Sequence, residues 1–377
     1  MIATAPHQCG GGNAGAGGIQ GKNFAWDDKE DIMRFGFFDQ LPRADWQSER
    51  QRYQDILAQI ELGDALGFDT AWLGELHFLP SFSCLASPLM ILAAAAQRTT
   101  RIRLGTAVTL LPLHSPVKMI EDAATLDVLS GGRLEFGVGR GASPVYYSGY
   151  NVPMEESRGR FEESLEVIIQ AWTSERLSYQ GKYFHVQNLP VIPKPVQKPY
   201  PPIRIAANSP DTFATAGHLG LPIFASPLIN PPDKLQEYLK VHRETLKPGA
   251  TQDVALAFPV HVAESRAQAR RECERSLMHF FSLASELLKP LADAPVASYE
   301  AYQQLQGRIK QVTFESVDRN VGIFGDPEYC VERIQALRQD LPMEEFIAYF
   351  NQGGLIDHAT VRRSMELFAQ EVIPRCR

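Results

Sequence analysis

The sequence predicts an α/β fold, a (β/α)8 TIM barrel with loop insertions. From about residue 33 onward, short apolar runs bounded by turns alternate with longer segments whose apolar residues recur every three or four positions. This alternation is typical of a parallel sheet covered by helices, and eight such units are the number that closes a barrel. An open doubly wound sheet is the alternative. It is disfavoured because the first strand ends in Phe37-Phe38-Asp39-Gln40, without a GxGxxG loop.

The individual elements follow from local pattern. The expected strands are short apolar runs between turn residues, and the clearest helices show the three- and four-residue spacing of an amphipathic face. The strands are expected at 34–38, 70–74, 103–110, 134–138, 203–207, 222–225, 254–262 and 345–350, and the clearest helices at 53–66, 89–97, 117–129 and 157–172.

Three segments depart from this pattern. Residues 1–31 are rich in glycine and poor in large apolar side chains, so we expect a disordered leader followed by a single domain over 32–377. Six prolines between 179 and 202 prevent a helix and impose an extended path. Residues 289–320 are too many for an ordinary connection, and they are our candidate substrate lid, with a plain helical decoration as the alternative.

Composition excludes several classes of function. The 37 basic and 44 acidic residues give a net charge of −7, which argues against a nucleic-acid partner. The sequence has no run of about 18 apolar residues, so we expect no membrane span. Five widely spaced cysteines without a CxxC pair fit a reduced, cytoplasmic setting. The nine histidines show no HExxH spacing, so no metal site is expected.

Candidate proton-transfer residues follow the second and third strands. Glu75 and His77 come directly after the second strand, and His114 follows the third. The carboxyl ends of barrel strands carry the active site, and a histidine beside a carboxylate suits proton transfer near neutral pH. A histidine packed under a loop is the structural alternative for each.

Candidate anion-binding residues follow the fourth and fifth strands. Arg140 lies between Gly139 and Gly141, where the backbone can approach a ligand and a guanidinium can bind phosphate. The segment Asn208-Ser209-Pro210-Asp211-Thr212 opens a helix whose free N–H groups favour an anion, although Ser209 and Thr212 could equally be simple caps.

Further candidates ring the expected mouth of the barrel. Asp39 and Gln40 end the first strand, and Asn351 and Gln352 end the last, where polar groups can bind a cofactor or substrate; turn residues are the alternative. Four aromatic residues could form a pocket wall or serve as packing alone: Phe78, Phe82, Tyr146 and Tyr147.

Several strings, in order, resemble the bacterial luciferase-like family of flavin-dependent monooxygenases. They are LGFDTAWLGELH at 66–77, RIRLGTAV at 101–108, LPLHSP at 111–116, LDVLSGGRLEFGVGRG at 126–141, YQGKYF at 179–184, PVQKPYPPI at 195–203 and GDP at 325–327. The resemblance extends from about residue 34 to 373.

The resemblance implies a cofactor, partners and site residues. Reduced FMN would react with O2 to give a C4a-peroxyflavin, which transfers one oxygen atom to a small organic substrate. A separate NAD(P)H-dependent flavin reductase would supply the reduced flavin, and the chain would be a homodimer that pairs through helices near 88–98 and 117–129. Hydride transfer with a deazaflavin, or flavin binding without catalysis, are the alternatives. The implied cofactor-binding residues are Arg140, Arg158, Ser209, Thr212, Asn208 and Ala107, and the catalytic ones are His77, Glu75 and His114.

Two positions depart from the luciferases proper. Luciferases have Glu-His-His where this chain has Glu75-Leu76-His77, and their reactive cysteine is replaced by Gly139. Light emission and long-chain aldehyde specificity are therefore not expected. An alkane, a terpene, a ketone, a sulfur compound and a polyketide all stay open as substrates.

Overall fold

Eight parallel strands close into a barrel in the computed structural model, which describes residues 32–289 and 300–377. Around the barrel the strands run β1-β2-β3-β5-β8-β9-β10-β12, and β12 pairs with β1 to complete the ring. The (β/α)8 barrel predicted from the sequence is thus confirmed. The expected leader at 1–31 lies outside the described residues.

The strands are short, as the apolar runs predict, and most of their residues are buried. They are β1 Arg34–Asp39, β2 Thr70–Leu73, β3 Arg103–Thr106, β4 Thr109–Leu110, β5 Leu134–Gly139, β6 Leu177–Gln180, β7 His185–Leu189, β8 Ile203–Ala206, β9 Ile223–Ala225, β10 Val254–Val262, β11 Ile323–Gly325 and β12 Glu345–Tyr349.

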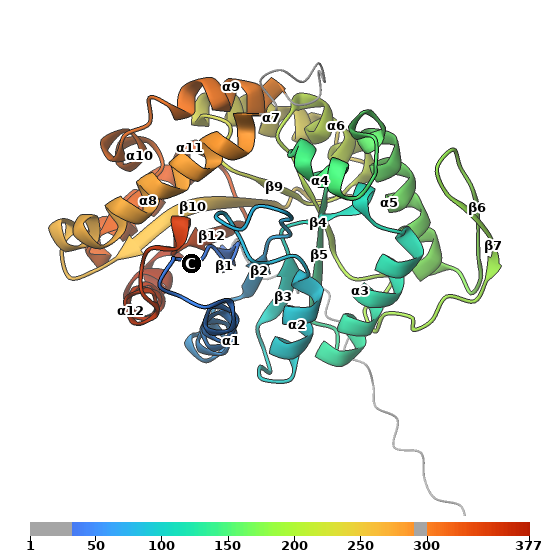
Figure 1. The fold of residues 1–377 in the computed structure, drawn as a ribbon, viewed down its shortest axis with the longest axis horizontal. Coiled ribbons are helices and arrows are strands. Elements are labelled where there is room, and N and C mark those ends of the chain that lie inside the picture. Colours follow the sequence, from blue (N-terminus) through green and yellow to red (C-terminus); the bar gives the residue numbers. More distant parts are fainter. Residues whose placement is uncertain (1–31, 290–299) are drawn as a thin grey trace, which may run out of the picture.

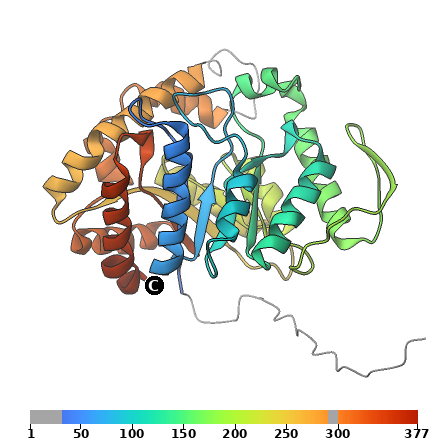
Figure 2. The ribbon, with the colours of Figure 1, turned by 60° about the horizontal axis from the view of Figure 1, so that its bottom comes forward.

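Helices surround the barrel, and Figures 1 and 2 show α1 and α12, from opposite ends of the chain, side by side where the ring closes. Local signals set their ends: Ser48 caps the start of α1, and Gly67 ends it in the left-handed region. The helices are α1 Glu49–Leu66, α2 Pro88–Ala96, α3 Pro116–Ser130, α4 Pro144–Gly149, α5 Ser157–Thr173, α6 Pro210–Leu219, α7 Pro232–Glu244, α8 Arg266–Leu288, α9 Glu300–Ile309, α10 Phe314–Asn320, α11 Pro327–Asp340, α12 His358–Leu367 and α13 Ile373–Cys376.

The structure corrects the prediction in three places. The expected third strand at 103–110 divides into β3 and β4, and β4 pairs only with β5. Strand β11 was not expected; it pairs with β10 outside the ring. The proline-rich segment begins with an antiparallel hairpin, β6–β7, which stands beside α5 in Figure 1. Within the insertion at 289–320, the described residues form α9 and α10, while 290–299 lie outside the description.

An ionic network fills the amino-terminal end of the barrel. Asp253 accepts hydrogen bonds from Arg34 at 2.6 Å and from Arg204 at 3.0 Å, and Trp72 donates to Glu345 at 2.7 Å. Arg34, Arg204, Asp253 and Glu345 stand where β1, β8, β10 and β12 begin, and Trp72 reaches them from β2. In other barrels the opposite, carboxyl end carries the active site. Within the described residues, no helix combines the length and apolar character needed to cross a bilayer.

Candidate active site

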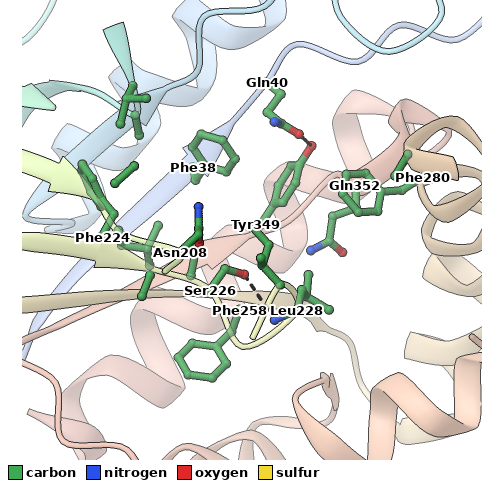
Figure 3. A pocket seen from close by; sticks show the side chains of 18 of the residues that line it. Phe38, Gln40, Asn208, Phe224, Ser226, Leu228, Phe258, Phe280, Tyr349 and Gln352 are labelled. Atoms are coloured by element: carbon green, nitrogen blue, oxygen red, sulfur yellow. Dashed lines mark hydrogen bonds between the residues drawn. The ribbon is translucent and has the colours of Figure 1, made fainter. Parts of the chain in front are cut away.

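A cavity of about 310 Å³ lies where the strands end, enclosed mainly by apolar and aromatic side chains (Figure 3). A volume of this size suits a small organic ligand. Its described lining contains no Asp, Glu, Lys, Arg or His. The lining residues are Phe38, Gln40, Phe82, Ala107, Val108, Ala206, Asn208, Phe224, Ala225, Ser226, Leu228, Ile229, Ala257, Phe258, Phe280, Phe281, Ala284, Leu287, Leu288, Ile309, Ile347, Tyr349 and Gln352.

A few neutral polar groups interrupt this apolar wall. The Tyr349 hydroxyl donates a hydrogen bond of 3.1 Å to Oε1 of Gln40, and burial raises the Tyr349 pKa well above its usual value, so the hydroxyl stays neutral. Ser226 Oγ accepts from the Leu228 amide at 3.3 Å. The amide nitrogen of Gln352 has no hydrogen-bond partner among the described residues.

The four polar residues expected at the mouth divide into two kinds. Gln40 and Gln352 line the cavity as predicted. Asp39 instead accepts from Arg52 at 2.5 Å and from the Leu41 amide, and Asn351 accepts from the Ile356 amide at 3.3 Å. Asp39 and Asn351 are therefore structural turn residues, since their own chain satisfies their side-chain oxygens.

Glu75, His77 and His114 form one buried hydrogen-bonded cluster. Nε2 of His77 and Nε2 of His114 lie 2.7 and 2.6 Å from Glu75 Oε1, and the Leu110 amide donates to Glu75 Oε2 at 3.0 Å. The loop after β3 thus brings His114 to the residues that follow β2. The opposite nitrogen of the His77 ring, Nδ1, lies 3.3 Å from the Tyr150 hydroxyl.

Glu75 and His114 each stabilise the charged form of the other. Burial would raise the Glu75 pKa, but hydrogen bonds from His114 and His77 outweigh it and lower that pKa below its usual value. Burial would lower the His114 pKa, yet the hydrogen bond to Glu75 and the attraction of its charge raise it above the usual value. A carboxylate held between two imidazoles can therefore keep a proton within the cluster.

The same three residues offer a donor set typical of metal sites, with ligand atoms all within 4.8 Å of one another. Their contacts of 2.6 and 2.7 Å are hydrogen bonds between side chains. These contacts join the three side chains into one hydrogen-bonded group.

The cluster is not part of the cavity lining, although Ala107 and Val108 of the loop that leads to His114 are. Tyr146 and Tyr150 pack their rings against His77 at centroid distances of 5.8 and 4.9 Å. Leu76, which replaces the luciferase histidine, is buried in the main core between its two polar neighbours. Of the four predicted aromatic wall residues only Phe82 lines the cavity. Phe78 and Tyr146 pack on His77, and Tyr147 donates to the Arg140 carbonyl.

The predicted anion-binding residues meet on two neighbouring strands. Arg140 follows β5 and Ser209 follows β8, and these strands pair through Val138 and Ile205. Ser209 is the N-cap of α6 but makes no capping bond; its hydroxyl lies 3.0 Å from that of Thr212. In the first turn of α6, Pro210 has no N–H and the Thr212 amide donates to the Ser209 carbonyl at 2.9 Å, so among the described residues the Asp211 amide is the first-turn donor left for an anion. Arg158 joins this region through an exposed 3.4 Å contact with Asp211.

The remaining predicted cofactor residues, Ala107 and Asn208, both line the cavity. They connect the anion-binding region to the apolar interior, because Asn208 directly precedes Ser209. Close packing explains why position 139 is glycine: a Cβ atom there would lie 2.5 Å from Cγ2 of Val108. The space for a luciferase-type cysteine is occupied by that valine.

Helix α8 contributes a wall that the sequence did not reveal. Five of its residues line the cavity: Phe280, Phe281, Ala284, Leu287 and Leu288. In sequence they look like the buried face of an amphipathic helix. Several of them do pack into the main core in addition to lining the cavity. Recurrence at three- and four-residue spacing was the only available signal, and it does not distinguish a cavity wall from a core.

Comparison with known proteins agrees with this geometry. The luciferase-like monooxygenase family matches residues 33–344. Limonene 1,2-monooxygenase of Rhodococcus erythropolis is 31% identical over 342 residues, which cover 88% of this chain and 83% of that protein. The oxygenase component of the trigonelline monooxygenase of Acinetobacter baylyi is 25% identical and covers 91% and 95%. The match to y4wF of Sinorhizobium fredii, at 39%, spans 50% of this chain and about half, 54%, of that protein.

A solved structure gives the same result. The monooxygenase RslO1 from Streptomyces bottropensis superposes with a TM-score of 0.76 at 26% identity, covering 91% of this chain and 99% of that one. Because the family match spans most of the sequence, this chain belongs to the luciferase-like monooxygenase family.

Proposed function

We propose that this protein is a flavin-dependent monooxygenase that uses reduced FMN and O2 to transfer one oxygen atom to a small organic substrate. The observation that carries the proposal is the junction of a phosphate-type site with an apolar cavity. Arg140 and the uncapped start of α6 stand at one side, and Asn208 leads from them into an enclosure of about 310 Å³.

The residues present fit FMN. Arg140, the Ser209 and Thr212 hydroxyls and the Asp211 amide would hold the phosphate, with Arg158 adding positive charge from α5. Ala107 and Asn208 would contact the ring system inside the cavity. When bound, reduced FMN supplies the two electrons that activate O2, so that one oxygen atom enters the product and the other leaves as water.

The chain's own residues would exclude water and hold the proton. Phe38, Phe82 and Phe224 line the cavity with apolar surface, which would limit the access of water to reactive oxygen species. His77 can hold a proton at Nδ1, where the Tyr150 hydroxyl meets it, while Glu75 accepts from Nε2 and stabilises the charged ring. His114 shares the same carboxylate and would restore the proton.

A separate flavin reductase is the proposed partner. The similarity of this chain to the trigonelline monooxygenase supports this partner, because that relative is named as the oxygenase component of its enzyme. In this proposal the chain receives FMN already reduced by an NAD(P)H-dependent enzyme.

Isotope incorporation tests the proposed function. Purified protein, FMN, a flavin reductase, NADH and a panel of candidate substrates are incubated under ¹⁸O2, and products are analysed by mass spectrometry. We expect a product two mass units heavier than that formed under ¹⁶O2. A parallel incubation replaces FMN with a deazaflavin. Oxidised or reduced products that lack ¹⁸O and form only with the deazaflavin would instead establish the hydride-transfer alternative.

A further inference from the structure

We propose that Gln352 is a substrate-positioning residue whose amide holds the oxygen of a neutral, otherwise apolar substrate, such as a ketone or an alcohol. The inference rests on the proposed monooxygenase function and names the substrate class of the same cavity. Three observations carry it: how the backbone fixes Gln352, the unpaired amide, and the absence of charge in the described lining.

The backbone of Gln352 is held rigidly against α8. Gln352 begins the short helical turn η5 (Gln352–Gly354) after β12, and Ser276 of α8 donates its hydroxyl hydrogen bond to the Gln352 carbonyl. Ser276 Oγ also accepts from the Leu355 amide at 2.9 Å. Gly353 has φ 77°, and a Cβ atom there would lie 2.1 Å from the Ser276 carbonyl oxygen. The side chain therefore starts from a fixed point.

The amide at its end is buried and unpaired. Gln352 is only 5% exposed, it lines the cavity, and its Nε2 has no hydrogen-bond partner within the described part of the chain. Figure 3 shows the amide directed into the cavity near Tyr349 and Leu228. The other lining glutamine, Gln40, accepts from Tyr349. Because buried polar groups are nearly always satisfied, an unpaired donor aimed into a cavity indicates a ligand acceptor.

The lining defines the rest of the ligand. No acidic, basic or histidine side chain is among the described lining residues, so a carboxylate, phosphate or ammonium group would lie there uncompensated. Phe280 and Leu228, which lie near Gln352 in Figure 3, offer apolar surface. A hydrocarbon body with one carbonyl or hydroxyl oxygen satisfies both the wall and the amide.

Gln352 also lies on the substrate side of the barrel. Around the ring, β12 and β1 stand opposite β5 and β8. The proposed phosphate residues, Arg140 and Ser209, follow β5 and β8. Gln352 therefore lies across the mouth from the proposed phosphate residues, where a substrate has room beside the cofactor in this proposal.

A pair of ligands that differ in one oxygen tests the proposal. Carvone has the limonene skeleton with one added ketone oxygen, and binding of both to wild type, Gln352→Leu and Leu228→Ala is measured by calorimetry. Gln352→Leu keeps a side chain of similar size but removes the donor. We expect it to weaken carvone binding about fivefold to tenfold, the scale of one neutral hydrogen bond, with limonene unchanged or tighter. The control Leu228→Ala should weaken both ligands by the same factor, since it removes only apolar contact.

Three results would overturn the assignment: equal effects of Gln352→Leu on both ligands, wild type that prefers limonene, or wild type that binds neither. Quenching of FMN fluorescence is measured on the same proteins as a separate readout. If all variants bind FMN normally but bind carvone and limonene without preference, the proposed role of Gln352 is rejected and the proposed monooxygenase function is not. If wild-type protein fails to bind FMN, the proposed function fails, and the carvone–limonene comparison still decides the role of Gln352.

Discussion

At the scale of single residues, Arg140 offers the sharpest test of the cofactor. It directly follows β5, and Ser209, the N-cap of α6, follows the paired strand β8. We expect Arg140→Ala to weaken FMN binding by about 2 kcal/mol, because a charge-assisted phosphate contact is lost. Riboflavin, which lacks the phosphate, should lose little affinity. Fluorescence titration with both flavins measures the difference, and equal losses would remove Arg140 from the phosphate site.

His77 tests the proton-holding role of the cluster. Its Nε2 is tied to Glu75 at 2.7 Å, so replacement disturbs a buried carboxylate. His77→Gln keeps an amide able to donate to Glu75 but cannot carry a proton. We expect product formation in a single turnover to slow by roughly 100-fold, with flavin affinity nearly unchanged. Oxygen transfer at the wild-type rate with weaker substrate binding would make His77 a binding residue.

The raised pKa of His114 gives a pH-dependent prediction. Since the folded-state pKa exceeds the ordinary value of about 6.5, the pair with Glu75 stabilises the fold below that pH. This contribution is lost as pH rises through the folded-state pKa. Glu75→Gln should shift the His114 titration to lower pH in NMR spectra of ¹⁵N-labelled histidine, assigned with a His114→Gln variant.

Urea unfolding checks the same pair thermodynamically. The difference in free energy of unfolding between wild type and Glu75→Gln should be larger at pH 6 than at a pH above the His114 titration, because charged His114 stabilises the fold through Glu75 only below that titration. A difference independent of pH over that range, with an unmoved NMR titration, would show that Glu75 does not hold the charged form of His114.

At the scale of elements, the approach of β5 to the loop after β3 sets a packing limit. A Cβ atom at position 139 would meet Val108 Cγ2 at 2.5 Å. Gly139→Ala should therefore lower the free energy of unfolding by about 1–3 kcal/mol. The double variant with Val108→Ala should recover most of the loss, because the colliding methyl is removed. Chemical denaturation of the four proteins measures the coupling, and additive effects would contradict this contact.

Elements with continuous apolar runs could be predicted from sequence, because strands buried on both faces need such runs. Strand β11 was missed since it has three residues and pairs only at the edge of β10. The β6–β7 hairpin was missed because its residues are mostly exposed and show no clean alternation. The prolines of the segment follow the hairpin.

At the scale of the whole molecule, barrel topology explains which site residues could be foreseen. Residues after strands β1, β2, β5, β8 and β12 gather at one end by geometry alone, so Gln40, Glu75, Arg140, Asn208 and Gln352 could be predicted from their positions. The inward face of α8 could not, because only the closed structure decides whether an apolar helix face meets a core or a cavity. Contacts are likewise needed to tell whether a polar strand-end residue is satisfied, as Asp39 is, or lacks a partner among the described residues, as Gln352 Nε2 does.

The last prediction concerns assembly. Helices α2 and α3 pack together on one side of the barrel, and they expose Met90, Val128 and Leu129 at 72%, 46% and 49%. Large exposed apolar side chains on two packed helices favour an interaction surface, and we expect the chain to be a homodimer through this face. Light scattering at micromolar concentration should give twice the mass of one chain. Met90→Asp combined with Val128→Asp should give a single chain, because buried charges would face each other across the interface. The control Leu219→Asp, at an exposed apolar residue of α6, should leave the dimer intact. A wild-type protein with the mass of one chain, or dissociation by the control alone, would place the contact elsewhere or exclude it.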